Sequence, residues 1–187
     1  MKDCLLLIDI QNDYFPGGKM ELVEPIAATL NAKKLLNYFR KNNKNVVFIQ
    51  HIANKPGATF FLPDTEGINF HPLIEPLEEE LVFQKHYPNS FRDTGLLESL
   101  RGNQIDRLII CGMMTHMCID STTRAACDFG FEVILAQDAC TTKSLKFGEQ
   151  ICPADLVHYS FLAALQGSFA TVCKTSEIVK QLKIKIK

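Results

Sequence analysis

Residues 108–118 read LIICGMMTHMC and decide the expected fold of this chain. The apolar run 108–111 leads into a turn that contains Gly112, and residues 118–129 continue with helical character. A buried strand that passes through a short turn into a helix is the repeating unit of parallel α/β folds. The same order places the Cys118 thiol at a helix N-terminus, where unpaired N–H groups and the helix dipole lower a cysteine pKa. The stretch therefore predicts a parallel sheet and a reactive thiol.

Short apolar runs recur along the rest of the chain, with helical segments between them. The other expected strands are residues 4–8, 46–50, 81–84, 133–136 and 170–173. The expected helices are residues 26–39, 93–100, 118–129 and 153–166. This alternation predicts an α/β fold, a three-layer α-β-α sandwich with a mostly parallel six-stranded sheet of Rossmann-like type.

Composition narrows the class of protein. The 187 residues, 47% of them hydrophobic, suit one domain spanning residues 1–187. A formal net charge of −1 argues against disorder and against a nucleic-acid partner. The one basic cluster is interpreted as a solvated terminal segment, and it comprises Lys180, Lys183, Lys185 and Lys187.

Cysteine usage and hydropathy bear on the location of the protein. Seven cysteines lie at irregular intervals without a CxxC pair, which favours reduced thiols in the cytoplasm. The N-terminal apolar run 4–8 is too short for a signal peptide or a membrane span, so no membrane association is expected. Residues 53–80 are rich in proline and glycine and read as a long loop, of the kind that is usually functional or mobile.

Three residue types that carry chemistry follow strands of the predicted sheet. Asp9 closes the first strand, Lys85 follows the third, and Cys118 follows the fourth. Ligands of open parallel sheets bind at the carboxyl ends of the strands, so we expect these three side chains to converge at one sheet edge. Each also has a structural interpretation: Asp9 as a cap of the next turn, Lys85 as a solvated strand-end lysine, and Cys118 as a buried core cysteine.

Several segments together resemble a known family. Residues 5–15 read LLLIDIQNDYF, residues 85–96 read KHYPNSFRDTGL, and residues 111–126 read CGMMTHMCIDSTTRAA; Gly-Phe-Glu-Val at 130–133 and Asp-Ala at 138–139 follow in order. These segments resemble the isochorismatase-like cysteine hydrolase superfamily, which includes nicotinamidases and N-carbamoylsarcosine amidases. The resemblance runs from the first strand to about residue 169 and implies the isochorismatase-like hydrolase fold.

The resemblance implies roles for the three residues. Asp9 would be the general base toward the Cys118 thiol and then the acid that protonates the departing amine, while Lys85 would supply fixed positive charge. The backbone N–H groups of Met114 and Cys118 would form the oxyanion hole, in a turn shaped by a cis bond between residues 113 and 114. Water would hydrolyse the acyl-cysteine intermediate, and no cofactor is implied.

The metal site of nicotinamidases is not matched. Those enzymes carry an Asp and two His residues after the second strand, whereas this chain has His51 without an Asp two positions earlier, and its next histidine is His71. We therefore predict no bound metal. A thiol nucleophile favours cleavage of a C–N bond in a small amide, carbamoyl or ureido substrate. An isochorismatase-type ether hydrolase, which does not need the thiol, is the alternative.

Substrate contacts and assembly are less specified. The candidate contacts are Phe15, Gln50, His51, Phe91 and His116. Core packing and hydrogen bonding to the backbone are the other interpretations of these side chains. The resemblance implies a homo-oligomer, a dimer or tetramer. A non-catalytic binding protein and a redox-responsive thiol protein, with Cys111 or Cys140 as the second thiol, remain alternatives on the same fold.

Overall fold

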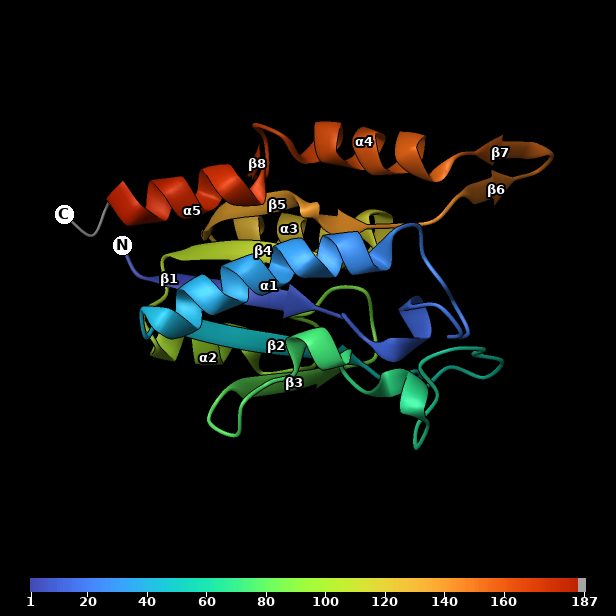
Figure 1. The fold of residues 1–187 in the computed structure, drawn as a ribbon, viewed down its shortest axis with the longest axis horizontal. Helices are drawn as coiled ribbons and strands as arrows, with labels where there is room; N and C mark the ends of the chain where they lie inside the picture. Colours follow the sequence, from blue (N-terminus) through green and yellow to red (C-terminus); the bar gives the residue numbers. More distant parts are fainter. Residues whose placement is uncertain (185–187) are drawn as a thin grey trace.

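The computed structural model describes residues 1–184, and its centre is a six-stranded parallel sheet with the strand order β3-β2-β1-β4-β5-β8 (Figure 1). From β1 the chain adds β2 and β3 on one side of the sheet, and it then adds β4, β5 and β8 on the other side. The carboxyl ends of β1 and β4 are therefore the topological switch point. The predicted parallel sheet is confirmed. Its strands are β1 (Asp3–Ile8), β2 (Asn45–His51), β3 (Leu81–Lys85), β4 (Arg107–Met113), β5 (Glu132–Thr141) and β8 (Thr171–Cys173).

Helices cover both faces of the sheet. Side chains alternate along a strand, so Leu5 and Leu7 of β1 pack with α1 and α5, while Cys4 and Leu6 pack on the opposite side with α2, α3 and α4. Both faces of β1 and β4 are buried, which explains why these strands read as continuous apolar runs. The helices are α1 (Pro25–Lys41), α2 (Leu96–Gly102), α3 (Asp120–Asp128), α4 (Ala154–Leu165) and α5 (Thr175–Ile184).

The C-terminal segment corrects the expectation of a solvated tail. Residues up to 184 form α5, which buries Ile178 and Leu182 against the sheet and leaves Lys180 and Lys183 exposed. Ile178 and Leu182 are four residues apart, the spacing of one helix face. The other two lysines of the predicted basic cluster, Lys185 and Lys187, lie outside the described residues.

Three local features differ from the expected elements. A hairpin of β6 (Leu145–Phe147) and β7 (Gln150–Cys152) was not predicted, because strands of three residues carry too little periodicity. Helix α2 begins after Gly95, whose φ of 71° interrupts the helix expected from residue 93. A π-helical turn, η4 (Thr115–Ile119), precedes α3.

The long loop 53–80 contains the short turns η2 (Glu66–Ile68) and η3 (Pro72–Ile74), and its first part packs beside the segment that follows β1. The N–H of Phe61 donates to the buried Asp13 carboxylate over 2.6 Å, and Phe70 pairs with Gln11 in an isolated antiparallel bridge. Asp13 itself belongs to the turn η1 (Asn12–Tyr14) directly after β1. The loop is therefore tied to the first strand segment. No helix among residues 1–184 is long and apolar enough to cross a lipid bilayer.

Candidate active site

Asp9 lies at the centre of the carboxyl edge of the sheet, directly after β1. Its N–H donates to the carbonyl of Ile49 over 3.0 Å, and its backbone then turns into the left-handed region with a φ of 52°. Aspartate tolerates this conformation better than most residues, and such strain concentrates at functional sites. The turn holds the carboxylate where no solvent reaches it.

Gly112 lets β4 approach β1 at this point. In the register of the two strands, Gly112 lies opposite Ile8, and an added Cβ at residue 112 would lie 2.0 Å from the Ile8 carbonyl oxygen. Its φ of 131° is also open only to glycine. The glycine is thus required for the close contact that brings the Asp9 segment beside the turn after β4.

Lys85 and Cys118 meet Asp9 in the same buried space. The Lys85 Nζ atom lies 2.7 Å from Asp9 Oδ2 and donates to Cys118 Sγ over 3.1 Å. The ammonium also contacts the Tyr87 carbonyl at 3.1 Å and His51 Nδ1 at 3.0 Å. Three hydrogen-bond partners and the Asp9 carboxylate therefore surround one cation. The interpretation of Lys85 as a solvated strand-end lysine is wrong, because its side chain is buried.

The Asp9 carboxylate is close to its neighbours but not saturated by them. Its ion pair with Lys85 is short, yet neither oxygen accepts a well-aligned hydrogen bond from any residue within 1–184. A buried carboxylate without aligned donors is rare, since the desolvation cost is then uncompensated. Such oxygens are free to take a proton from a thiol or a water.

The charges of these groups are coupled. Burial acts to lower the pKa of Lys85, but the charges of Asp9 and Cys118 outweigh it and raise that pKa above its ordinary value. Burial raises the pKa of the Cys118 thiol, Asp9 raises it further, and Lys85 does not cancel these effects. The directions of these two shifts favour an ammonium on Lys85 and a neutral thiol on Cys118 at neutral pH.

This corrects the expectation of a lowered thiol pKa. Cys118 does lie in the first turn of the helical segment formed by η4 and α3, as predicted. The thiol is only 4% exposed, however, and burial together with the charge of Asp9 raises its pKa by more than the charge of Lys85 lowers it.

His51 is fixed as a neutral neighbour of the ammonium. Burial, opposed by the charge of Asp9 and assisted by the charge of Lys85, lowers its pKa to about 4. An ammonium has only donors, so Nδ1 of His51 accepts from Lys85 and the ring proton is on Nε2. The buried Gln11 side chain holds the His51 backbone at both ends, accepting from its N–H over 2.7 Å and donating to its carbonyl over 2.9 Å.

Asp9, His51 and Cys118 also form the one group within residues 1–184 whose ligand atoms are spaced for a metal ion, all within 4.8 Å of one another. Oxygen, imidazole nitrogen and sulfur suit zinc. The Lys85 ammonium contacts all three residues, so it fills the position that a cation would take. A metal would have to displace that charge.

The other predicted substrate contacts lie in different surroundings. The Phe15 ring stacks on His71 with centroids 3.9 Å apart, and Gln50 donates to the Ile68 carbonyl and accepts from Gln84. Phe91 packs against Phe129 and Phe131, with centroids 5.1 and 6.3 Å away. The His116 ring is bonded to Thr142 through Nδ1. Of the five candidates, only His51 forms a hydrogen bond with Asp9, Lys85 or Cys118.

Two aromatic side chains that are not among the five candidate contacts lie near Asp9, Lys85 and Cys118. Tyr14 is buried, and its pKa is raised by burial and by the charges of Cys118 and Asp9. Phe61 contacts both Tyr14 and His51, with centroids 4.6 and 5.7 Å apart. Tyr14 is the sequence neighbour of the predicted contact Phe15. Both rings are buried, but Tyr14 packs against Phe61 whereas Phe15 stacks on His71.

The expected cis peptide bond is present between Met113 and Met114, where β4 ends. Met114 then precedes η4, and its carbonyl accepts from the N–H groups of Met117 and Ile119. The assignment of the Met114 and Cys118 N–H groups to an oxyanion hole stays a prediction.

Comparisons with known proteins identify relatives of this chain. The sequence model of the isochorismatase domain matches residues 3–177. The chain is 48% identical over 180 residues to the uncharacterized isochorismatase family protein YddQ of Bacillus subtilis, covering 96% of this chain and 100% of that protein. It is 34% identical over 140 residues to streptothricin hydrolase of Streptomyces noursei, covering 74% of this chain and 49% of that protein. The crystal structure of an isochorismatase from Pseudomonas putida superposes with a TM-score of 0.88 at 33% identity, covering 94% of this chain and 89% of that one.

Proposed function

Because the chain belongs to the isochorismatase family, whose members are generally hydrolases, we propose that it cleaves a C–N bond of a small amide, carbamoyl or ureido substrate with Cys118 as the nucleophile. One observation carries the proposal: the Lys85 ammonium lies 2.7 Å from Asp9 and 3.1 Å from Cys118 at the switch point of the sheet. A base, a fixed cation and a thiol from three distant segments share one buried space.

The chemistry begins with a protonated thiol. Asp9 accepts the Cys118 proton as the sulfur attacks the carbonyl carbon, so that a free thiolate is not needed at rest. The resulting tetrahedral oxyanion collapses by breaking the C–N bond, and Asp9 returns the proton to the departing nitrogen. An acyl-cysteine remains.

The second half regenerates the thiol. Asp9 accepts a proton from water, the hydroxide adds to the thioester carbonyl, and the sulfur leaves as it regains a proton. Lys85 keeps a positive charge beside both partners throughout, which stabilises whichever of them is anionic. Neutral His51 keeps its Nε2–H as a donor, suited to an acceptor oxygen on the substrate.

The surroundings favour a small substrate. Asp9, Lys85 and Cys118 are nearly inaccessible to solvent, and the aromatic rings of Tyr14 and Phe61 lie close to them. Entry of a substrate therefore requires some of the surrounding side chains to move, which a small molecule needs less than a large one. The name of the streptothricin hydrolase relative is consistent with hydrolysis on this fold.

The redox alternative is less well supported. Burial raises the pKa of Cys140 to about 12 and that of Cys111 well above its ordinary value, and both side chains are buried. A buried thiol with a raised pKa reacts slowly unless a base takes its proton, as Asp9 is proposed to do for Cys118. A non-catalytic binding role leaves the convergence of Asp9, Lys85 and Cys118 without a reason.

A substrate screen tests the proposal. Amides, N-carbamoyl compounds and ureides are incubated with the wild type, with Cys118→Ala, and with Cys127→Ala as a matched control on α3, and amine or ammonia release is measured. We expect loss of turnover only in Cys118→Ala, and mass spectrometry should detect an acyl adduct on Cys118. Equal turnover by Cys118→Ala would exclude covalent catalysis, and a vinyl-ether substrate such as isochorismate would then be tried next.

A further inference from the structure

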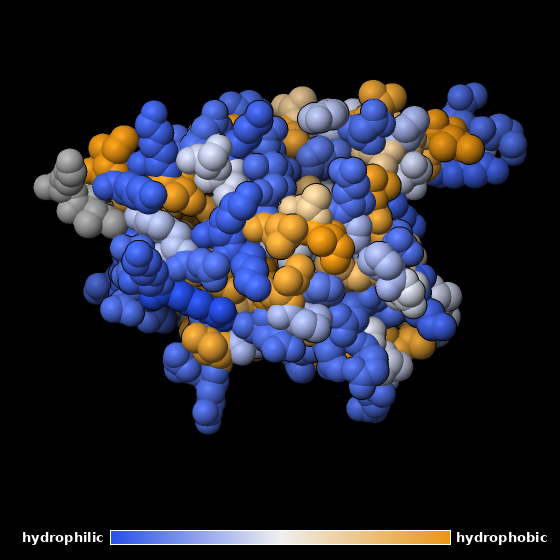
Figure 2. Space-filling model, in the orientation of Figure 1, coloured by the Kyte–Doolittle hydropathy of each residue, from blue (hydrophilic) through white to orange (hydrophobic). Residues whose placement is uncertain are grey.

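Helix α4, which Figure 1 shows at the top of the molecule, packs against the turn η4 that carries the nucleophile. Its outer face is exposed, and Figure 2 shows a mixture of hydrophilic and apolar side chains along it. His158 is half-buried at the boundary between this outer face and the core. Three buried apolar side chains anchor the helix in the core: Val157, Leu162 and Leu165. The His158 ring is therefore held by a helix that the core fixes in place.

A hydrogen bond joins His158 to Thr115 in the turn. The Thr115 Oγ1 and His158 Nδ1 atoms are 2.8 Å apart, and this is the one hydrogen bond of the buried Thr115 hydroxyl within residues 1–184. Burial lowers the pKa of His158, and a hydrogen bond with the backbone of Gln137 in β5 opposes this only in part. A backbone bond that raises a histidine pKa is one in which the ring donates to a carbonyl. Because Nδ1 faces Thr115, that donor is Nε2, and Nδ1 accepts the Thr115 proton.

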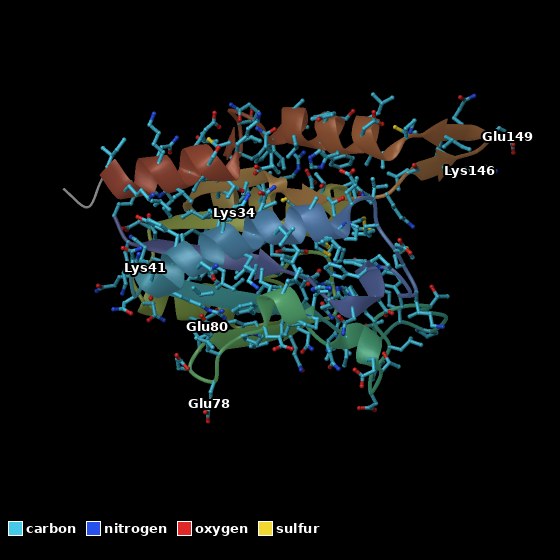
Figure 3. All side chains as sticks on the ribbon, viewed as in Figure 1. Lys34, Lys41, Glu78, Glu80, Lys146 and Glu149 are labelled. Atoms are coloured by element: carbon cyan, nitrogen blue, oxygen red, sulfur yellow. The ribbon has the colours of Figure 1, made fainter. Side chains whose placement is uncertain are left out.

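This bond joins two neutral groups. Burial and the Gln137 bond are the causes that shift the pKa of His158, rather than a neighbouring charge. Lys146 and Glu149, the charged residues at the tip of the β6–β7 hairpin that precedes α4, point away from the body of the protein, as Figure 3 shows. A lowered pKa keeps the ring neutral at neutral pH, so Nδ1 stays an acceptor. The hydrogen bond is therefore permanent under these conditions.

The turn η4 is wound more loosely than an α-helix. The N–H of Ile119 donates to the carbonyl of Met114, five residues back. The N–H of Asp120 donates in the same way to the carbonyl of Thr115. Such π-helical turns are rare and occur mostly at functional sites. Thr115 lies directly after Met114, whose N–H is predicted to bind the oxyanion, and three residues before Cys118, so a shift of Thr115 displaces both groups.

We propose that His158 is a positioning residue, which holds the Thr115 hydroxyl and thereby fixes the Cys118 sulfur and the Met114 N–H for attack on the substrate. The proposal rests on the function proposed for Cys118. His158 acts only through Thr115, and its ring takes no part in the reaction. A residue that aligns the reacting groups affects kcat more than KM, because alignment is needed in the transition state more than in binding. A bond that served only the stability of the fold would not show this difference.

Paired substitutions at the two ends of the bond test the proposal. Thr115→Val and His158→Leu remove the bond, whereas Thr115→Ser keeps the donor and His158→Asn keeps an acceptor. On a substrate found by the screen, we expect Thr115→Val and His158→Leu to lower kcat about tenfold or more and to change KM by less than about threefold. Thr115→Ser and His158→Asn should keep most of the activity. The double variant Thr115→Val with His158→Leu should lose no more than the worse single variant, because both changes break the same bond.

Thr29→Val is the matched control. Thr29 is also fully buried, and its hydroxyl also makes a 2.8 Å bond, which goes to the Pro25 carbonyl within α1. The substitution removes the same group from the interior but leaves the turn η4 unchanged. We expect Thr29→Val to lose stability and to keep kcat.

A second measurement needs no substrate. A turn released from α4 exposes the Cys118 sulfur, so iodoacetamide at a fixed alkaline pH should alkylate Cys118 faster in Thr115→Val than in the wild type or in Thr29→Val. Turnover and alkylation then change in opposite directions. Partial unfolding does not explain this result if Thr29→Val leaves both rates unchanged.

Equal kcat in Thr115→Val and Thr115→Ser overturns the positioning role, as do losses that multiply in the double variant. Alkylation of Cys118 that is no faster in Thr115→Val and His158→Leu than in Thr29→Val also overturns it. A wild type without turnover refutes the proposed function instead, and the alkylation rates then decide the positioning role. Circular dichroism checks that the variants fold. If Thr115→Val does not fold, His158→Leu and His158→Asn give the same comparison at a half-buried side chain.

Discussion

Replacing Lys85 by Met and Asp9 by Asn, singly and together, measures how the buried ion pair is organised. The two single variants are not expected to cost the same stability. Lys85→Met leaves the Asp9 carboxylate buried without its cation, and neither carboxylate oxygen has another aligned donor within residues 1–184. Asp9→Asn leaves the ammonium with three acceptors: His51 Nδ1, the Tyr87 carbonyl and Cys118 Sγ.

The magnitudes follow from this asymmetry. Breaking a buried pair by removing one partner costs about 3–5 kcal/mol, and we expect Lys85→Met to lie in that range. Asp9→Asn should cost about 1–2 kcal/mol, the net value of one charge-assisted contact, because the cation remains hydrogen-bonded. The double variant buries no charge and should be no less stable than Lys85→Met, so the coupling energy should be about 1 kcal/mol or more.

Urea unfolding of the four proteins at pH 7.5 gives these free energies. The pH is chosen from the sign of the Lys85 shift. Its folded pKa is raised above the unfolded value, so the stabilisation is fully present below the unfolded pKa and is lost as the pH rises through the folded pKa. Equal costs for the two single variants, or costs that simply add in the double variant, would refute the described arrangement of the pair.

Three further predictions concern single side chains. His51→Asn, whose side-chain oxygen can replace Nδ1 as the acceptor for Lys85, should keep more kcat than His51→Leu; equal losses in the two variants would show that this contact does not position the ammonium. Gly112→Ala should lower the free energy of unfolding by about 3 kcal/mol or more, because an added Cβ would clash with the backbone of Ile8 and because φ is positive at this residue. Gly102→Ala is the near-neutral control, since a Cβ at residue 102 meets open space. Thermal unfolding of the two variants measures the difference. Alkylation of Cys118 by iodoacetamide without substrate should be slow at pH 7 and should accelerate only at alkaline pH, because burial raises the thiol pKa. Peptide mass spectrometry measures the alkylation rate at Cys118. A rate that reaches its plateau below pH 8 would contradict this prediction.

The sheet was predictable because its signal is local. Strands β1 and β4 are buried on both faces, so their residues form continuous apolar runs that stand out in the chain. The hairpin β6–β7 and helix α5 were not predicted. The strands of the hairpin are too short for a periodic pattern. Helix α5 buries only two apolar side chains, Ile178 and Leu182, among its lysines, so its apolar face gives a weak signal.

The candidate site divides in the same way. Asp9, Lys85 and Cys118 could be chosen from the sequence, since each follows an apolar run and carboxyl ends of parallel strands share an edge. The substrate contacts could not, because a strand-end or loop residue gives no local indication of where its side chain points. Phe15, for example, stacks on His71, while its neighbour Tyr14 lies near the reactive groups.

By itself, the sequence determined the order of the elements, the parallel sheet and the meeting of Asp9, Lys85 and Cys118 at one sheet edge, because these depend on hydrophobic pattern and on strand ends. Only the tertiary structure decided the protonation of the site. Lys85 is enclosed by four acceptors from separate segments, and the Cys118 thiol is desolvated beside Asp9. Desolvation and Coulomb energies depend on distances between residues far apart in the chain, so a helix N-terminus read locally predicted a thiolate where burial keeps a thiol.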